Sequence, residues 1–271
     1  VLLCAFFCLL LYFNSLWGIF IFDDNHSILD NLYIKDAGYI PMFFKGYYTS
    51  ETEIPQGMFR PLLLLTFSFN YLFSGLQPLG YHIINLLLHF LNAVLFYCLL
   101  KLLSSLPGGQ VKEDRSGLKK SLPFGLTLSL TLLFLAHPLN TEAVAYISSR
   151  SDLMVSLFIL LGLIAYLKRR IFSVITFYIL GLLSKETALV FFFLILALHF
   201  VYYRNLEMPR EEKRKLLFLN FLIIGISILY WVYRGAVFGL AAKDIILAPL
   251  QSPLRSFWSN ILTQSAVTLF Y

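Results

Sequence analysis

Two neighbouring carboxylates, Asp23 and Asp24, directly follow an apolar run over residues 1–22. A carboxylate at a membrane boundary can accept or orient the proton of a hydroxyl group, which is general base catalysis. Acids at the C-terminal end of a helix oppose the helix dipole, so this placement is slightly unfavourable unless it serves a purpose. We therefore expect Asp23 and Asp24 to be the catalytic residues. The alternative is a solvated helix end.

A second group of candidates surrounds residues 137–152. Arg150 is suited to neutralising a phosphate through paired hydrogen bonds. Glu142 is expected to pair with Arg150 or to contact a substrate hydroxyl, and the alternative is an ordinary ion pair at the membrane interface. His137 precedes Pro138, so it either contacts substrate or only caps a helix end.

Lys185 and Glu186 interrupt a long apolar stretch. Charges within a membrane are costly and indicate a functional site by default. We expect Lys185 to contact a phosphate and Glu186 to orient Lys185, with simple structural pairing of the two as the alternative. Arg60 and Arg255 are further cations that would bind an anionic head group or anchor the chain at the interface.

The segment 79–103 carries a polar stripe of His82, Asn85, His89 and Asn92 at spacings of 3, 4 and 3. These spacings place all four side chains on one helix face. Hydrogen bonding between membrane helices explains such a stripe. Only His82, nearest the outer end, is retained as a candidate substrate contact.

The composition indicates what must position these residues. Of 271 residues, 59% are hydrophobic and 13% are charged, and the mean hydropathy is +0.76, unlike a soluble globular domain. The net charge of +6 does not indicate nucleic-acid binding, because the basic residues are scattered through short loops. The three cysteines lie in apolar segments without paired spacing, so we expect neither disulfides nor a metal site.

We predict an all-α, polytopic transmembrane bundle of about seven spans. A helix needs ~20 apolar residues to cross a bilayer, and the candidate spans are 1–22, 79–103, 122–138, 151–168, 171–184, 187–203 and 216–238. The stretch 171–203 is divided into a hairpin because basic residues flank both of its ends. Residues 23–78 form a long extracytoplasmic loop, in which 61–76 is a helix lying in the interface. Residues 239–271 are expected to be an outer loop or the start of another span.

Charge sets the predicted orientation, because Lys and Arg collect in cytoplasmic loops. Thirteen of the 21 basic residues then lie inside: Lys101, Lys112, Arg115, Lys119, Lys120, Lys168, Arg169, Arg170, Arg204, Arg210, Lys213, Arg214 and Lys215. Most of the acids lie outside. Acids follow the topology rule weakly, so this bias indicates a functional outer face.

Several short motifs in order resemble a known enzyme family. They are Asp23-Asp24-Asn25, Arg60-Pro61-Leu62, Gly80-Tyr81-His82 with Asn85 and His89, His137-Pro138 with Thr141-Glu142 and Arg150, and Ser184-Lys185-Glu186. From about residue 20 to 237, the chain resembles the transmembrane and tetratricopeptide-repeat protein O-mannosyltransferases and their prokaryotic relatives in the GT-C superfamily.

The resemblance implies a catalytic acid at the end of the first span and a sugar donor carried on polyprenyl (dolichyl-type) phosphate. The family's acidic pair maps onto Asp23 and Asp24, its second-loop acid onto Glu142, and its later Lys-Glu pair onto Lys185 and Glu186. Tetratricopeptide repeats are absent from this sequence, and the membrane domain of such enzymes continues past residue 271. Since the chain begins with Val and ends in an apolar stretch, we expect it to be part of a longer protein.

The expected function is transfer of a sugar, mannose for this family, to a hydroxyl of an acceptor protein or glycan on the extracytoplasmic side. Asp23 or Asp24 would take the hydroxyl proton, and Lys185, Arg150 or Arg255 would stabilise the departing phosphate. A single displacement inverts the anomeric carbon. The expected location is a bacterial or archaeal plasma membrane, or the endoplasmic reticulum of a eukaryote.

Two other classes of function compete with this one. A transporter or lipid flippase would have polar residues near the membrane midplane and related internal repeats, and a non-catalytic scaffold would tolerate loss of both aspartates. The acidic loops also leave a divalent cation open as a cofactor, although no residues have convincing ligand spacing.

Overall fold

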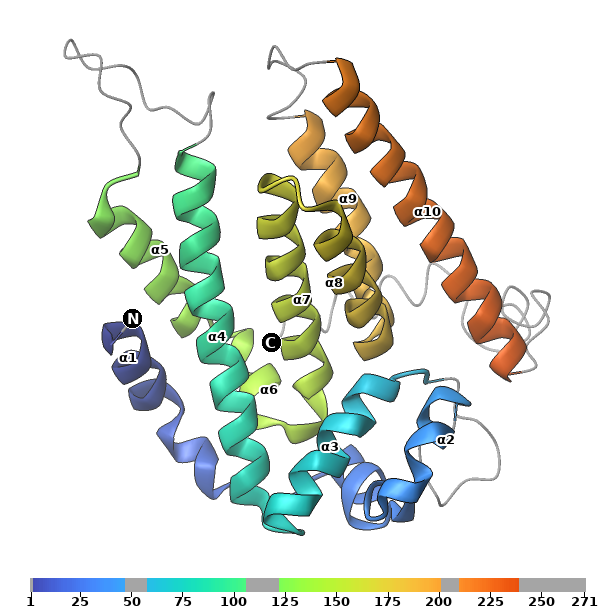
Figure 1. The fold of residues 1–271 in the computed structure, drawn as a ribbon. Coiled ribbons are helices and arrows are strands. Elements are labelled where there is room, and N and C mark those ends of the chain that lie inside the picture. The colour runs from blue at the N-terminus through green and yellow to red at the C-terminus, as the bar shows by residue number, and fades with distance from the viewer. Residues whose placement is uncertain (1, 47–57, 106–121, 201–209, 239–271) are drawn as a thin grey trace, which may run out of the picture. The chain divides into compact units, whose positions relative to one another are not determined.

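The computed structural model describes residues 2–46, 58–105, 122–200 and 210–238. Within these ranges all regular secondary structure is helical, which confirms the all-α prediction. The α-helices (Figure 1) are α1 (Leu2–Tyr12), α2 (Ile40–Phe44), α3 (Pro61–Ser74), α4 (Pro78–Ser104), α5 (Phe124–Ala136), α6 (Asn140–Ala145), α7 (Arg150–Leu167), α8 (Ile171–Ser184), α9 (Val190–Leu198) and α10 (Arg210–Phe238). Short 3-10 and π turns connect several of them: η1 (Phe13–Trp17), η2 (Asn25–Leu29), η3 (Leu32–Ile34), η4 (Ala37–Tyr39), η5 (Ile147–Ser149) and η6 (Glu186–Leu189).

The chain divides into two units after Ile228. The first unit holds α1 to α9 and most of α10. In the second unit, the described residues are 229–238, the end of α10. The candidate residues that the structure describes all lie in the first unit.

Helix α4 lies at the centre of the first unit and packs against α1, α3, α5, α6 and α7, while α7 also packs along α8. Polar side chains of α4 meet the start of α7: Asn92 Nδ2 donates to the Leu153 carbonyl at 2.9 Å, and Arg150 Nε donates to Asn85 Oδ1 at 2.8 Å. Because contacts at higher numbers on α4 meet higher numbers on α7, the two helices run parallel.

Within the described part of the chain, three helices are long and apolar enough to cross a membrane: Pro78–Ser104, Ile147–Leu167 and Arg214–Ala236. Five further apolar helices in the same ranges are shorter, among them Leu2–Trp17 and Pro61–Ser74. The first apolar run is regular α-helix only to Tyr12 and continues as a 3-10 turn to Trp17. The chain is therefore that of a membrane protein, with helices at each position where the sequence predicts a span.

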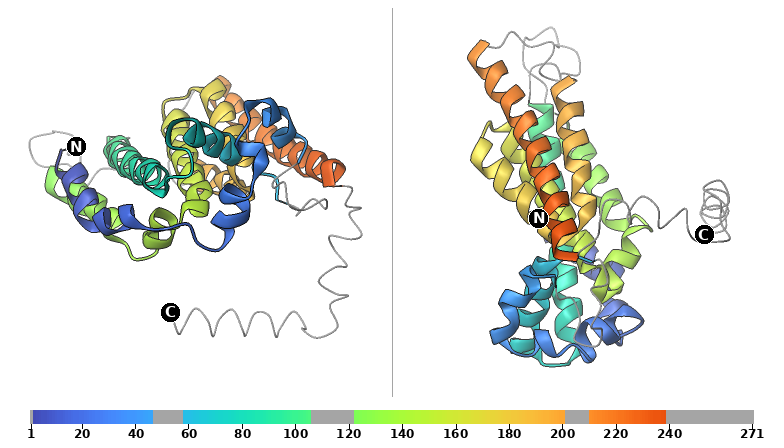
Figure 2. Two further views of the ribbon diagram at one scale, coloured as in Figure 1. Left: turned by 90° about the horizontal axis from the view of Figure 1, so that it is seen from below. Right: turned by 90° about the vertical axis from the view of Figure 1, so that its right-hand side faces the viewer.

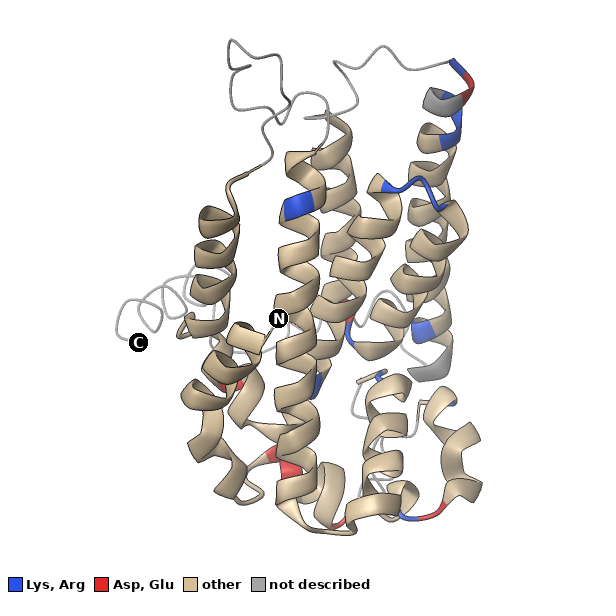
Figure 3. Cartoon of the chain, turned by 60° about the vertical axis from the view of Figure 1, so that its left-hand side comes forward, with Lys and Arg blue, Asp and Glu red and all other residues tan. Residues whose placement is uncertain are grey.

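The predicted break within 171–203 is present. Lys185 adopts an extended backbone (φ −165°, ψ 145°) that ends α8. Helices α8 and α9 then run in opposite directions, and their connection lies at the same end of the unit as the start of α7 (Figure 1). Basic residues gather at the other end (Figure 3), including Lys101 in the last turn of α4 and residues 168–170 between α7 and α8.

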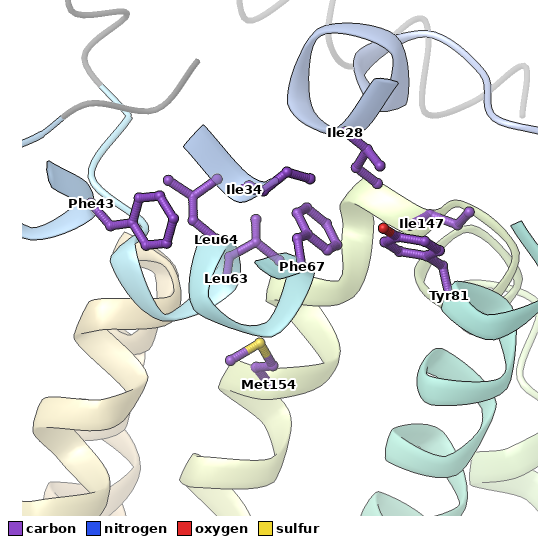
Figure 4. Close-up of a cluster of buried hydrophobic side chains, with 9 residues drawn as sticks. All are labelled: Ile28, Ile34, Phe43, Leu63, Leu64, Phe67, Tyr81, Ile147 and Met154. Atoms are coloured by element: carbon purple, nitrogen blue, oxygen red, sulfur yellow. The ribbon is translucent and has the colours of Figure 1, made fainter. Parts of the chain in front are cut away.

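The segment after α1 is folded against the helices. Figure 4 shows the buried cluster that joins them, in which Ile28, Ile34 and Phe43 pack with side chains of α3, Tyr81 of α4 and Met154 of α7. The right-hand view in Figure 2 shows α2 and α3 gathered at one end of the unit. Buried Cys4 and Cys8 belong to a second cluster with α4, α5 and α7, so they serve as small apolar residues.

Candidate functional site

Asp24 is 1% exposed and its carboxylate is held on both oxygens. The backbone N–H of Ser148 donates to Oδ1 at 2.9 Å, and the Ser148 hydroxyl donates a shorter hydrogen bond to the same atom. Oδ2 accepts from the backbone N–H of Ile21 at 3.1 Å. Burial raises the pKa of the Asp24 carboxyl, and these hydrogen bonds offset only part of that shift. Asp24 therefore ties the first loop to residues 147–149.

Asp23 is exposed, in contrast to its neighbour. Its backbone N–H donates to the Tyr146 hydroxyl at 3.0 Å. Burial raises the pKa of Tyr146 to about 12, and the nearby Asp23 and Asp24 charges act in the same direction. Tyr146 is thus a protonated hydroxyl at neutral pH that fixes the backbone from which the Asp23 carboxylate projects.

Arg150 is fully buried, and each of its three side-chain nitrogens donates a hydrogen bond. Nε donates to Asn85 Oδ1 at 2.8 Å. Nη2 donates to Asn70 Oδ1 at 2.8 Å and to the Tyr81 carbonyl at 3.1 Å. Nη1 makes longer contacts, to the Thr66 carbonyl at 3.5 Å and its hydroxyl at 3.4 Å. The guanidinium therefore joins α3, α4 and α7.

Aromatic rings enclose the same guanidinium, with the Phe67 centroid at 4.8 Å and the Tyr81 centroid at 5.6 Å. Such contacts stabilise a buried cation. The prediction that Glu142 could pair with Arg150 is wrong, because the partners of Arg150 are neutral groups and Glu142 is exposed on α6. Arg150 serves as a structural centre for three helices.

Lys185 and Glu186 have different partners. Lys185 Nζ donates to both carboxylate oxygens of Asp152, at 2.6 and 2.7 Å. Glu186 Oε1 lies 3.5 Å from Arg60 Nη2. The expectation that Glu186 orients Lys185 is therefore corrected: Asp152 does so, because the extended backbone at Lys185 directs adjacent side chains apart.

A cavity of about 290 Å³ opens between α4, α5, α6 and α7. Glu142 and Asp152 bring carboxylates to its wall, while His89 and Asn92 come from the stripe on α4. Asp152 lines this cavity and also binds Lys185. Glu142 and the carboxylate partner of Lys185 thus line one cavity, whereas Asp23 and Asp24 do not line it.

The polar stripe on α4 bonds neighbouring helices, which confirms the prediction. Asn85 Nδ2 donates to the carbonyls of Val144 and Tyr146, and His89 Nε2 lies 3.4 Å from the Leu135 carbonyl. His82 is 2% exposed and packs against Gly18. A Cβ atom at position 18 would lie 2.7 Å from His82 Nε2, so this approach requires glycine.

Two candidates remain, and the first of them, His137, is not among the residues that line the cavity. His137 is exposed at the end of α5, where its Nδ1 accepts the backbone N–H of Leu139 at 3.3 Å, as a helix cap would. Arg255 lies outside the described residues. Among the residues that the structure does describe, no group of three or more His, Cys, Asp or Glu side chains is placed to hold a metal ion.

Sequence reasoning missed the residues that hold the candidates in place. Tyr146 and Ser148 hold Asp23 and Asp24, and Ser149 lines the cavity. One short segment, residues 146–150, therefore contacts the acidic pair, the cavity, and helices α3 and α4. The available signal was the density of hydroxyl groups before Asp152, where an apolar span begins.

Known proteins with similar sequences are protein O-mannosyl-transferases by name. The chain is 34% identical to protein O-mannosyl-transferase TMTC4 of Mus musculus over 169 residues, which are 61% of the chain and 22% of that protein. It is 37% identical to protein O-mannosyl-transferase tmtc2 of Xenopus laevis over 166 residues, 59% and 18% of the two chains. For protein O-mannosyl-transferase F38B6.6 of Caenorhabditis elegans the identity is 30% over 200 residues, 72% and 27%.

This chain is similar to the protein O-mannosyl-transferases. The finding confirms the resemblance that the motifs indicated. The matched region spans only about a fifth to a quarter of the length of these protein O-mannosyl-transferases. No protein-family model matches the chain, and no solved structure matches it.

Proposed function

We propose that the protein containing this chain is a multi-pass membrane protein and an inverting GT-C mannosyltransferase. It transfers mannose from a polyprenyl-phosphate donor to a hydroxyl group of an acceptor protein. The single observation that carries the proposal is the contrast within the acidic pair, in which Asp24 is buried and held on both oxygens while Asp23 is exposed on a fixed backbone. The names of the similar proteins supply the sugar and the acceptor class.

Asp23 is the general base in this proposal. As the acceptor oxygen bonds to the anomeric carbon of mannose, its proton passes to the Asp23 carboxylate. The bond between the anomeric carbon and the phosphate oxygen breaks, and polyprenyl phosphate leaves with both electrons of that bond. Asp24 does not touch substrate and acts as a positioning residue through Ser148.

Lys185 and Arg60 are the cations assigned to the departing phosphate. Each already has one carboxylate partner, Asp152 and Glu186 respectively, which fixes its direction. Both are only partly buried, with side-chain exposures of 21% and 15%, so a phosphate can approach them. Arg150 has no such role, because its nitrogens are already engaged.

The proposed topology places the end of the helices that carries Asp23 and Lys185 on the extracytoplasmic side. The membrane is a plasma membrane or that of the endoplasmic reticulum. The basic turns at the opposite end would face the cytoplasm. Thr187→Cys at the hairpin tip and Leu32→Cys in the first loop should react with an impermeant thiol reagent added from outside. Ser105→Cys, at the far end of α4, should react only after permeabilisation. Labelling of Thr187→Cys and Leu32→Cys from opposite sides would refute this topology.

The decisive experiment measures mannose transfer in membranes containing the full-length protein. Radiolabelled polyprenyl-phosphate mannose and an acceptor protein are supplied to wild type, Asp23→Asn and Asp24→Asn. We expect Asp23→Asn to lose transfer by ~10² to 10⁴-fold, the usual contribution of a general base, without a change in melting temperature. Glu211→Gln, an exposed acid at the opposite end, is the matched control. Normal transfer by Asp23→Asn would remove this residue from the mechanism.

A further inference from the structure

The cavity between α4, α5, α6 and α7 is lined by several polar side chains. Asn92 is 1% exposed and lines this cavity. Its Nδ2 donates to the Leu153 carbonyl, whereas its Oδ1 has no hydrogen-bond partner among the described residues. A buried acceptor without a partner costs ~1–3 kcal/mol. Asn92 therefore brings a buried acceptor without a described partner to the wall of the cavity.

The other polar groups around Asn92 narrow the chemistry of the occupant. Carboxylates of Glu142 and Asp152 add acceptors, and the hydroxyls of Ser149 and Ser156 add groups that can donate or accept. Two carboxylates disfavour an anion such as a phosphate. An apolar chain would leave the polar groups unsatisfied. A neutral ligand that carries several hydroxyl groups satisfies them.

Two aromatic rings also line the cavity. The rings of His89 and Phe134 are stacked with centroids 5.6 Å apart, and both residues line the cavity. A pyranose ring has such a mixed character, with hydroxyl groups at its edge and C–H groups on its face. The cavity volume of about 290 Å³ lies just below the usual range for ligand sites, ~300 to 1,000 Å³. This size suits one sugar ring.

The position of the cavity relates it to the proposed reaction. Ser149, on its wall, adjoins Ser148, which holds Asp24. Asp152, also on its wall, binds the Lys185 ammonium group that we assign to the phosphate. A sugar in the cavity would thus lie beside both the acidic pair and the cation.

We propose that this cavity is the binding site for the hexose ring of the donor, with Asn92, Glu142 and Asp152 accepting hydrogen bonds from its hydroxyl groups. The inference rests on the proposed function and adds the residues that recognise the sugar. Glu142 and Asp152 contact substrate in this assignment. Asp23 remains the group that takes the acceptor proton.

Thiol protection in the full-length protein tests this assignment. Ala143→Cys and Leu139→Cys place reporters on the cavity wall, and Leu32→Cys places a control on the exposed first loop. Exposed Cys98 is replaced by alanine in all three, because it would react as well. The ligands are polyprenyl-phosphate mannose and polyprenyl phosphate without sugar. Leu139 is 81% exposed, so its variant should fold even if Ala143→Cys does not.

We expect the mannosyl donor to slow alkylation of both cavity reporters by about tenfold at a concentration ten times its Kd, as simple occupancy requires. Polyprenyl phosphate alone should not protect them, and Leu32→Cys should react at one rate throughout. Unchanged labelling at position 139 with the donor present, or equal protection by the sugar-free lipid, would overturn the cavity assignment. Mannose transfer by the wild type tests the proposed function in a separate measurement. A protein that transfers mannose without this protection therefore refutes only the cavity assignment.

Discussion

The two sides of the α4–α7 contact use similar polar residues in opposite ways. On the side towards α3, Arg150 is fully buried, and Asn70, Asn85 and the Tyr81 carbonyl take up its donors. On the side towards α5 and α6, Asn92 keeps an acceptor without a described partner, and Glu142 and Asp152 line a cavity. We call the first group closed, because the donors of Arg150 are used, and the second group open, because the Asn92 acceptor has no described partner.

This difference separates structural from functional polarity in a membrane protein. A polar group in lipid must be satisfied internally, so a completed network such as that of Arg150 stabilises the fold and offers nothing to a substrate. A network with unsatisfied groups around a cavity can be completed by a ligand. The type of residue does not distinguish the two cases, whereas the count of unused donors and acceptors does.

The largest effect on stability should come from Arg150→Met. This change leaves Asn70, Asn85 and a backbone carbonyl without their donor, each at a cost of ~1–3 kcal/mol. We expect a total loss of at least ~3 kcal/mol, measured as a fall in the melting temperature of the purified protein in detergent. Arg150→Lys should restore little of this, because one ammonium group cannot match the planar guanidinium. A melting temperature like that of the wild type would show that the network is not structural.

Asp24→Asn should have an intermediate effect. The amide can still accept from Ser148, but its NH₂ group would face the Ile21 N–H, at a cost of ~1–3 kcal/mol. The pKa of Asp24 is raised in the folded protein, so its contribution to stability is full below the unfolded pKa and is lost as pH rises through the folded pKa. The wild type's margin over Asp24→Asn should therefore be widest at acid pH. Melting curves at a series of pH values measure this margin, and widening with rising pH would contradict the assignment.

Tyr146→Phe should have a smaller effect on stability, ~0.5–1.5 kcal/mol, because it removes one acceptor for the Asp23 N–H. The rate of mannose transfer should be affected more strongly than the stability, because the backbone of the general base Asp23 is no longer fixed by the Tyr146 hydroxyl. With a pKa of about 12, Tyr146 stays protonated between pH 6 and pH 9. The ratio of wild-type to variant transfer rates should thus be constant over that range. A ratio that changes with pH would indicate that Tyr146 itself titrates during the reaction.

The smallest effect on stability belongs to Glu142→Gln in the open group. Glu142 is exposed, and a surface substitution of this kind usually changes stability by less than ~0.5 kcal/mol. Transfer assays at increasing donor concentration should show a raised KM for polyprenyl-phosphate mannose. A destabilisation as large as that of Arg150→Met would place Glu142 in a closed network and refute the distinction between the two groups.

The sequence predicted most of the helices but few of the side-chain partners. Apolar length and Pro61 or Pro78 at helix starts are local signals, and so is the break at Lys185. Pairing is not local: Lys185 binds Asp152, which is 33 residues away, although Glu186 is adjacent. The sequence suggested Arg150 as a phosphate ligand because its actual partners could not be recognised from neighbouring residues. These partners, on α3 and α4, lie 65 to 84 residues earlier. Charge and spacing in the sequence identify the candidate residues. Packing in the folded protein determines which of them can still contact a substrate.

Residues 146–150 assign a separate neighbour to almost every consecutive position: Tyr146 to Asp23, Ser148 to Asp24, Ser149 to the cavity and Arg150 to α3 and α4. A change in the length of such a segment should be more damaging than the exchange of any one of its side chains. Deleting or inserting one residue would shift every later side chain to the wrong neighbour at once. Homologous chains should therefore keep the same number of residues between Tyr146 and Arg150.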